Sequence, residues 1–528
     1  MIKKQILIIG ICAIAITALA IVLFVVLPPI LAEWNFIEKT EIKLIAAGTF
    51  ERRDAETFGA DVTEGGITET LGTSDRIMIA PQVTRERVKN IVVKNNLGTY
   101  KLIHHLGNDV YYFEGSELTP INPETIAGLF TNTGYLLAMT RVAAKDIDDG
   151  NEILADLTVF GLDEASDPTY FIVTDVNNTV YKIYIGNKIP TTGGYYVMFE
   201  DKSGLRPAIY ILDTTMETDV LATSYSLMLP IVAEPIPQNE YIFIDNFKMW
   251  KGGEQFLEIY NAPIPAGSEV LVNHQMTFPA PYTVSDKYTE ATSAFVNLTG
   301  IRVVDTFTPE EDETGLTDEM LVKYGFDQMS CKVSFTHNNK EFLFYFSKLN
   351  EAGNYYVVSM DFMSIVEISP ETVPFVSWDL LKFIEKPIFS QNINDVAEIA
   401  IKYPEGSGRE NVTFSLVGTG QTIEIRGNGK LLETQNFRQY YKAILSINLF
   451  DYETWRPAES DTPMVTMTIT MDSGYVYDYV FYFAATRRGF FNFNGSGEFY
   501  TQRERVLKLM TDTDLVLRNE PVDADSPE

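Results

Sequence analysis

Hydrophobic residues follow two kinds of pattern along this chain. The first is a single unbroken apolar run from Gln5 to Leu27, which Lys3 and Lys4 precede and two prolines follow. At about 1.5 Å of rise per residue, a helix of this length crosses a hydrocarbon layer of about 30 Å. The two lysines favour a cytoplasmic N-terminus. The pattern therefore predicts a single-pass anchor within residues 1–32 and an extracellular C-terminal part.

A cleaved signal peptide is the alternative interpretation of this segment. Such peptides have an apolar core of about 7–15 residues, followed by a small-x-small cleavage site. The only candidate site here ends at Ala32, with Ile30 at its −3 position, and the apolar run is longer. A lipoprotein signal is also disfavoured, because Ile11 precedes Cys12 where a small residue is needed. We therefore expect a retained anchor that contacts the lipid bilayer through residues 5–27.

The second pattern is a set of short alternating segments, predicted to be strands, around one amphipathic segment, predicted to be a helix. In its first occurrence, Asn122-Pro123-Glu124 supplies an N-cap, an N1 proline and a first-turn acid. This signal predicts a helix with Ile126, Leu129, Phe130 and Leu137 on one side. The predicted strands are Val88–Lys94, Tyr100–Ile103, Tyr170–Val176 and Val180–Ile185 with a turn at Asn177-Asn178, Gly194–Val197, and Ala208–Leu212.

The same order of segments occurs twice more. The second occurrence has a strand pair within Tyr241–Tyr260, a helix near Asp286–Leu298, a hairpin turning at Asn338-Asn339, and Gly353-Asn354-Tyr355-Tyr356-Val357. The third has strands at Ala397–Lys402 and Val412–Leu416, a helix at Asn436–Ile447, a hairpin turning at Asp472-Ser473-Gly474, and Gly489-Phe490-Phe491. Arg141-Val142 and Phe160-Gly161-Leu162-Asp163 in the first occurrence correspond to Arg302-Val303 and Tyr324-Gly325-Phe326-Asp327 in the second. Duplication within the chain explains this repetition economically.

These patterns predict an α+β fold of tandem units, each an antiparallel sheet with one helix, behind a single N-terminal transmembrane helix. Alternation of Tyr181, Ile183 and Ile185 with Lys182, Tyr184 and Gly186 predicts a sheet with one solvated face. The predicted organisation is an anchor at 1–32, a juxtamembrane segment at 33–87, three units at 88–235, 240–390 and 395–518, and an acidic tail at 519–528.

Composition narrows the range of partners. The chain has 72 acidic and 41 basic residues, for a net charge of −31, so nucleic acid and anionic lipid are poor partners for its exterior. Hydrophobic residues make up 45% of the sequence, which is enough for folded cores. Only Cys12 and Cys331 occur. An exterior disulfide within the chain is therefore excluded, and we expect Cys331 to be a small buried residue and not a nucleophile.

Searches for catalytic motifs give little. The histidines are scattered, and His104 and His105 are adjacent in a predicted strand, so their side chains point to opposite faces. Asp146-x-Asp148-Asp149-Gly150 has a glycine at the third ligand position of a calcium loop, which favours a solvated acidic turn. We therefore predict no catalytic, cofactor-binding or metal-binding residues and no enzyme activity. A carboxylate pair for glycoside chemistry stays open among 72 acids.

Aromatic residues after the repeated glycines are a further candidate. Tyr195, Tyr355 or Phe490 could stack on a ligand, but packing is the favoured interpretation, because successive strand side chains point to opposite faces.

Several segments resemble one bacterial family. They are Ile77-Met78-Ile79-Ala80-Pro81-Gln82-Val83, Val88–Lys94, Gly98-Thr99-Tyr100, Phe160-Gly161-Leu162-Asp163, Tyr181–Gly186 and Thr191-Thr192-Gly193-Gly194-Tyr195-Tyr196-Val197. With the anchor, they are similar to the bacterial domain-of-unknown-function family 4340, best over residues 75–235. The resemblance implies a membrane-anchored surface protein, often associated with ABC-type export systems and related to auxiliary proteins of gliding motility. It carries over no functional residues.

The sequence therefore favours a membrane-anchored extracytoplasmic accessory or binding scaffold beside an ABC-type permease. Two alternatives stay open: a cell-wall or glycan-active enzyme with an unrecognised carboxylate site, and a passive surface structural protein. Ligand, partner identity and oligomeric state do not follow from the sequence.

Overall fold

The computed structural model describes residues 43–46, 70–71, 76–107, 109–143, 146–148, 151–153, 156–191, 193–201, 204–264, 270–309 and 314–524. The predicted anchor at 5–27 lies outside these residues. Within them, no helix is both long enough and apolar enough to span a membrane. Two compact units are found, residues 1–230 with 302–306 and residues 231–301 with 307–528.

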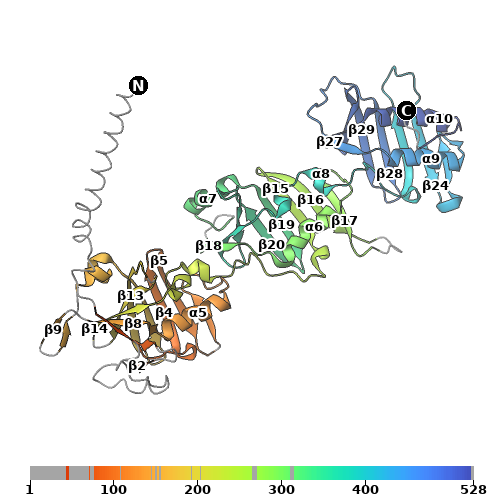
Figure 1. Ribbon diagram of the computed structural model, residues 1–528. Coiled ribbons are helices and arrows are strands. Elements are labelled where there is room, and N and C mark those ends of the chain that lie inside the picture. The colour runs from red at the N-terminus through yellow and green to blue at the C-terminus, as the bar shows by residue number, and fades with distance from the viewer. Residues whose placement is uncertain are drawn as a thin grey trace, which may run out of the picture. The chain divides into compact units, whose positions relative to one another are not determined.

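Antiparallel sheets dominate the described chain, and helices are few (Figure 1). The first sheet has the order β1-β8-β14-β13-β12-β11-β4-β5-β6. Its strands are β1 (Lys43–Ala46), β4 (Val88–Asn95), β5 (Gly98–His105), β6 (Val110–Phe113), β8 (Thr140–Ala143), β11 (Thr169–Asp175), β12 (Val180–Lys188), β13 (Tyr195–Asp201) and β14 (Gly204–Leu212). Two small sheets accompany it, β2 (Thr70–Leu71), β3 (Ile77–Met78) and β7 (Leu137–Ala138), and the hairpin β9 (Asp146–Asp148) and β10 (Asn151–Ile153).

The second sheet has the order β17-β16-β15-β19-β20-β21-β22-β18. Its strands are β15 (Asp245–Lys251), β16 (Glu254–Ala262), β17 (Asn273–Phe278), β18 (Arg302–Thr306), β19 (Cys331–His337), β20 (Lys340–Phe346), β21 (Tyr355–Ser359) and β22 (Ser364–Ile368). Three short α-helices occur between or after these strands, α6 (Lys287–Ser293), α7 (Asp318–Tyr324) and α8 (Leu380–Phe383).

The third sheet has the order β26-β25-β24-β23-β28-β29-β30-β31-β27. Its strands are β23 (Val396–Lys402), β24 (Val412–Val417), β25 (Glu424–Gly427), β26 (Lys430–Leu431), β27 (Leu449–Tyr452), β28 (Val465–Met471), β29 (Val476–Ala485), β30 (Arg488–Phe493) and β31 (Phe499–Gln502). Its helices are α9 (Thr434–Leu445) and α10 (Arg503–Leu517).

The three sheets share one order of connection. In each, a meander runs from the middle of the sheet to one edge, as β4-β5-β6, β15-β16-β17 and β23-β24-β25-β26 do. The strand that follows the helix lies towards the opposite edge of the sheet. A four-strand meander then lies between this strand and the first meander. The repeated Arg141-Val142 and Arg302-Val303 steps are parts of those post-helix strands, β8 and β18. A shared topology of eight strands supports the predicted duplication.

Each unit has its predicted helix, although α9 begins two residues before the predicted start at Asn436 and α6 ends at Ser293. In α5 (Pro123–Gly134), the Asn122 side chain accepts a hydrogen bond from the Glu124 amide, which confirms the predicted N-cap. Its buried residues include Ile126, Leu129 and Phe130. Leu137 was expected on the same face, but this prediction is wrong, because the helix ends at Gly134 and Leu137 belongs to β7. In α9, the Glu433 carboxylate accepts from the amides of Gln435 and Asn436.

Asparagine and glycine residues form the hairpin turns as predicted. Asn178, Asn338, Asn339 and Gly474 have φ values of 59°, 49°, 63° and 83°, in the left-handed region that asparagine and glycine tolerate. The repeat also predicts that Gly194, Gly353 and Gly489 occupy matching strand positions, and this prediction is wrong. Gly353 (φ 80°) matches Gly193 (φ 72°) and not Gly194, while Gly489 lies inside β30.

Alternating side chains on the strands build the cores. Along β12, Tyr181, Ile183 and Ile185 are buried, and the residues between them are half-buried, so the predicted alternation is present. The face that was predicted to be solvated is covered in part, because Tyr184 packs against a second core cluster that includes Phe160. In the second unit, Tyr288 and Phe295 from the helical segment pack on the sheet residues Phe247 and Phe335 with ring-centroid distances of 5.5 and 4.7 Å. Aromatic contacts of this kind add to the free energy gained from burial of apolar area.

Candidate binding cleft

A cleft of about 460 Å³ lies within the second compact unit, where the second and third sheets meet. Its volume is in the range of small-molecule and side-chain binding pockets. The lining residues combine charged, polar and aromatic side chains: Lys251, Glu254, Gln255, Phe256, Phe278, Leu380, Tyr452, Arg456 and Glu498.

The wall from the second sheet is the turn between β15 and β16. Gly252 and Gly253 form this turn with φ values of 59° and 82°, so Lys251 ends one strand and Glu254 begins the next. The Lys251 ammonium donates a hydrogen bond to the Trp378 carbonyl oxygen. It also lies 4.5 Å from the centroid of the Phe256 ring, in a cation-π contact.

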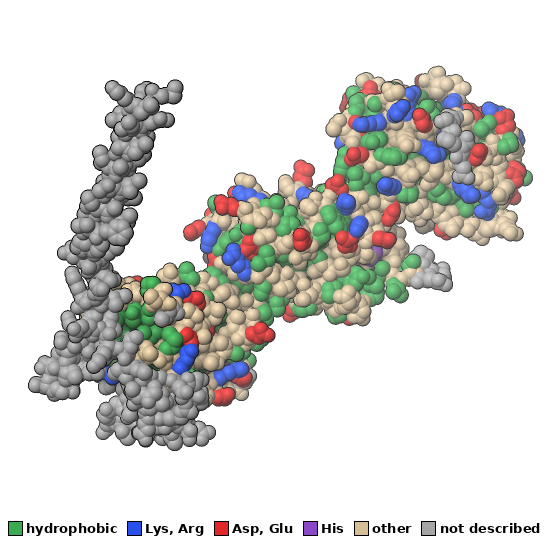
Figure 2. Space-filling view, viewed as in Figure 1, with side chains coloured by type: hydrophobic (Ala, Val, Ile, Leu, Met, Phe, Trp, Pro, Cys, Tyr) green, Lys and Arg blue, Asp and Glu red, His purple; other side chains and the backbone are tan. Residues whose placement is uncertain are grey.

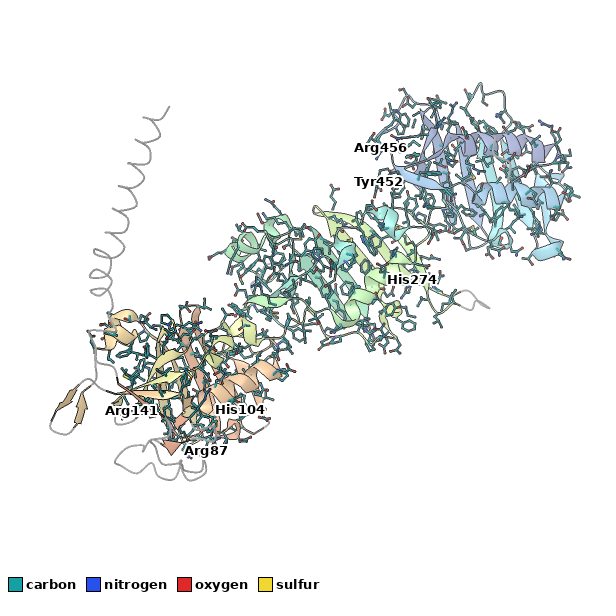
Figure 3. All side chains as sticks on the ribbon, viewed as in Figure 1. Arg87, His104, Arg141, His274, Tyr452 and Arg456 are labelled. Atoms are coloured by element: carbon teal, nitrogen blue, oxygen red, sulfur yellow. The ribbon has the colours of Figure 1, made fainter. Side chains whose placement is uncertain are left out.

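The wall from the third sheet comes from β27 and two loops. Tyr452 is the last residue of β27, Arg456 follows it in the chain, and both lie at one edge of the third sheet (Figure 3). The Arg456 guanidinium donates to the carbonyl oxygens of Glu453 and of Trp455, the second at 3.0 Å. Glu498 precedes β31, and its carbonyl oxygen accepts a hydrogen bond from the Glu453 amide at 2.9 Å.

Two contacts join these walls. The Leu380 amide, at the start of α8, donates to the Tyr452 hydroxyl oxygen at 2.9 Å. Tyr282, from the segment after β17, packs edge-on against Phe493 and Phe499 at 5.3 and 5.6 Å. Because Tyr452 also contacts Phe499, at 4.9 Å, one aromatic cluster connects residues from both walls.

Burial changes the acidity of the groups in the cleft. It raises the pKa of the half-buried Glu498 carboxyl, and the nearby Arg456 guanidinium opposes this. It lowers the pKa of the Lys251 ammonium, against the opposing influence of Cys331 and Asp379. Burial also raises the pKa of Tyr452 to about 12, so its hydroxyl keeps its proton at neutral pH and can donate a hydrogen bond.

The histidines named from the sequence do not come together. His104 is buried in β5, with its ring nitrogens 2.9 Å from the Val88 carbonyl oxygen and from an Asp109 carboxylate oxygen, and its neighbour His105 is exposed. Their opposite faces are as predicted. His274 contacts Asn261 Oδ1 through Nδ1 at 2.7 Å, and its pKa is lowered by burial. His337 lies 3.1 Å from a Glu240 carboxylate oxygen.

The other candidate residues from the sequence are buried or held by contacts within the protein. Cys331 is fully buried, as predicted, and burial raises its pKa to about 12, which disfavours the reactive thiolate. Tyr355 and Phe490 are also buried, which supports packing. Tyr195 is half-buried and donates to a Glu217 carboxylate oxygen at 2.7 Å. Asp146–Asp148 form β9, and Asp149 and Gly150 lie outside the described residues.

Within the described ranges, no group of three or more His, Cys, Asp or Glu side chains is placed to hold a metal ion. Comparisons with protein-family models, with curated proteins and with solved structures found no match.

The residues of the cleft were not singled out by the sequence. They come from a strand turn, two strand ends and two loops, and Lys251 and Glu498 are far apart in the chain. The usable signal was weak: Gly252-Gly253 predicts a tight turn, and Tyr452 to Arg456 combines aromatic and charged residues in one short segment.

Proposed function

We propose that this protein is a membrane-anchored extracytoplasmic accessory or binding scaffold that works beside an ABC-type export system. The observation that carries the proposal is the recurrence of one eight-strand arrangement in three sheets, with a polar and aromatic cleft between the second and third. Repeated units enlarge the surface that is available for binding other molecules, and binding of this kind does not require a catalytic centre. The membrane and export context is what the resemblance to domain-of-unknown-function family 4340 implies, and no family model matches the chain.

Edges and exposed aromatic residues favour protein contact. The strands β17 and β27 are terminal in their sheets, so each has one side without a neighbouring strand among the described residues. Phe278 at the end of β17 and Phe450 in β27 are exposed. Acidic and basic side chains are interspersed over the surfaces visible in Figure 2. Aromatic residues among mixed charges are typical of protein-binding surfaces.

The test is capture of partners from membranes. The full-length chain should be cross-linked in its native cells, solubilised and purified, and the bound chains identified. We expect subunits of an ABC-type permease. A matched variant with residues 1–32 replaced by an unrelated single-pass anchor should capture the same chains, because the exterior part makes the contact. The proposal would be contradicted if no transporter subunit is captured, or if capture is lost when the natural anchor is replaced.

The predicted topology has its own test. Because lysines flank only the N-terminal side of residues 5–27, protease added to intact cells without their wall should digest the exterior part. Protection of the bulk of the chain, or a soluble form that starts near Glu33, would contradict the anchored interpretation.

One observation favours a glycan-active enzyme as a second candidate. Glu254 and Glu498 line the same cleft, and burial raises the pKa of Glu498, as in the general acid of many glycosidases. Turnover of peptidoglycan or polysaccharide that is lost in Glu498→Gln but kept in Glu290→Gln would support it. Glu290 is a suitable control because it pairs with Lys287 on α6.

A further inference from the structure

The charged groups of the cleft differ in how many hydrogen-bond partners the protein gives them. Both cations have carbonyl acceptors: Lys251 has that of Trp378, and Arg456 has those of Glu453 and Trp455. Both also lie on rings, Lys251 on Phe256 and Arg456 on Phe490, the latter at 5.4 Å. These contacts replace part of the water that each cation loses.

The two carboxylates of the cleft lack such partners. Within the part of the chain that the structure describes, neither the Glu254 nor the Glu498 carboxylate makes a hydrogen bond or ion pair with another side chain or amide. Glu498 is half-buried, so its charge has lost hydration without gaining a donor. Glu254 is exposed and keeps its hydration, and Arg456 acts on the Glu498 carboxylate only through its nearby charge. The group that the cleft still lacks is therefore an N–H donor that contacts Glu498 directly.

The other lining groups suit such a donor. The Gln255 amide nitrogen donates to a Glu258 carboxylate oxygen at 3.0 Å, so the remaining polar atom of its side chain, the carbonyl oxygen, is an acceptor. Phe256, Phe278 and Tyr452 supply aromatic surface, and a cation on an aromatic face is attracted by the ring. A lysine or arginine side chain combines an apolar stem for these rings with a charged end for the carboxylates.

We propose that the cleft receives a lysine or arginine side chain from a basic segment of a partner protein, with Glu498 and Glu254 as its counter-ions. The net charge of −31 supports this occupant, because a strongly acidic chain attracts cationic partners over long range. The inference rests on the proposed binding function and adds the chemistry of the partner.

The test uses the purified full-length chain and fluorescein-labelled octapeptides that alternate lysine with serine, glutamate with serine, or norleucine with serine. Fluorescence anisotropy should show binding of the lysine peptide only, weakened by added salt. Glu498→Gln and Glu254→Gln should each weaken binding about tenfold, because each removes a charge-assisted hydrogen bond. Glu290→Gln, which removes an equal charge on α6, should leave binding unchanged.

A charge reversal separates recognition from folding. Glu498→Lys should abolish binding of the lysine peptide while the melting curve of the chain stays cooperative. Equal binding of the three peptides, unchanged binding in Glu498→Gln, or displacement of the peptide by a neutral peptidoglycan oligosaccharide would overturn the proposal. Permease capture that persists without peptide binding would overturn only the cleft assignment, whereas loss of capture with intact peptide binding would overturn the transporter partnership.

Discussion

The first and third sheets share their strand order, yet their helical layers bury charge in different ways. Beside α5 in the first, the Asp219 carboxylate is buried and accepts hydrogen bonds from Asn132 Nδ2 at 2.6 Å and from the Val220 amide at 2.5 Å. In α10 of the third, Lys508 and Asp512 form a buried ion pair one turn apart, with Nζ and Oδ2 separated by 3.0 Å.

This difference shows what the repeated topology determines and what it leaves free. Strand order places a helix against each sheet, but the chemistry under that helix follows local sequence. The neutral donors Asn132 and Val220 do not fully offset the loss of hydration of the Asp219 carboxylate, so burial raises its pKa. The ion pair gives each of its charges an opposite partner, so the third layer depends on two residues at once.

The largest effect is expected from breaking the ion pair. Asp512→Leu leaves the Lys508 ammonium buried without its counter-ion, which should cost about 3–5 kcal/mol. Lys508→Met combined with Asp512→Leu should recover most of that loss, because apolar residues of similar volume replace a buried pair at little cost. Urea unfolding read by hydrogen exchange of the α10 amides measures both. A double variant as unstable as the single one would show that the pair is not the cause.

Two glycines of α5 have different surroundings. A Cβ atom on Gly134, the last residue of α5, would lie 2.2 Å from the Val83 carbonyl oxygen, so Gly134→Ala should destabilise the first unit by about 1–3 kcal/mol. At Gly128, inside the same helix, the nearest atom is 3.5 Å away, and Gly128→Ala should stabilise it by about 0.5–1 kcal/mol. Thermal unfolding of the two variants should shift in opposite directions; shifts of the same sign would contradict the packing argument.

The helix caps should matter about equally in the two layers despite their different residues. Asn122→Ala removes the acceptor of the Glu124 amide in α5, and Glu433→Ala removes the acceptor of two amides in α9. Each should cost about 1 kcal/mol. Asn122→Asp keeps the acceptor and should cost little. Amide exchange in the first turn of each helix reports the loss, and unchanged exchange would show that the cap is dispensable.

Local signals were enough to predict much of this fold. The N-cap before α5, the apolar spacing of Phe437, Tyr441 and Ile444 in α9, and the asparagine turns all act within a few residues. The short edge strands β6, β17 and β27 were missed, because a strand of so few residues does not show a clear alternation of apolar and polar side chains. The helix α10 was also missed, although Val506, Leu509 and Val516 have helical spacing.

The cleft could not be predicted, because its geometry depends on how two sheets pack. Glu254 and Glu498 are ordinary acids among 72 until folding brings the β15–β16 turn to the loop before β31. The sequence also does not show that these two carboxylates receive no hydrogen bond from a side chain or amide. The Lys508 and Asp512 spacing of four residues was visible, but i,i+4 pairs are usually exposed, and this pair is buried where α10 packs against α9 and the sheet.

The smallest effect concerns the neutral environment of Asp219. Because its pKa is raised in the folded state, the folded protein keeps a proton at pH values where the unfolded chain has lost it, so the charged carboxylate reduces stability at neutral pH. Asp219→Asn keeps an oxygen acceptor for the Val220 amide and removes the charge, and should stabilise the first unit at pH 7 by at most about 1 kcal/mol. The advantage should shrink as pH falls through the raised pKa towards the ordinary value of 3.8. Unfolding of the first unit at several pH values measures this. An advantage that grows on acidification would mean that Asn132 and Val220 compensate the charge, as Lys508 does for Asp512.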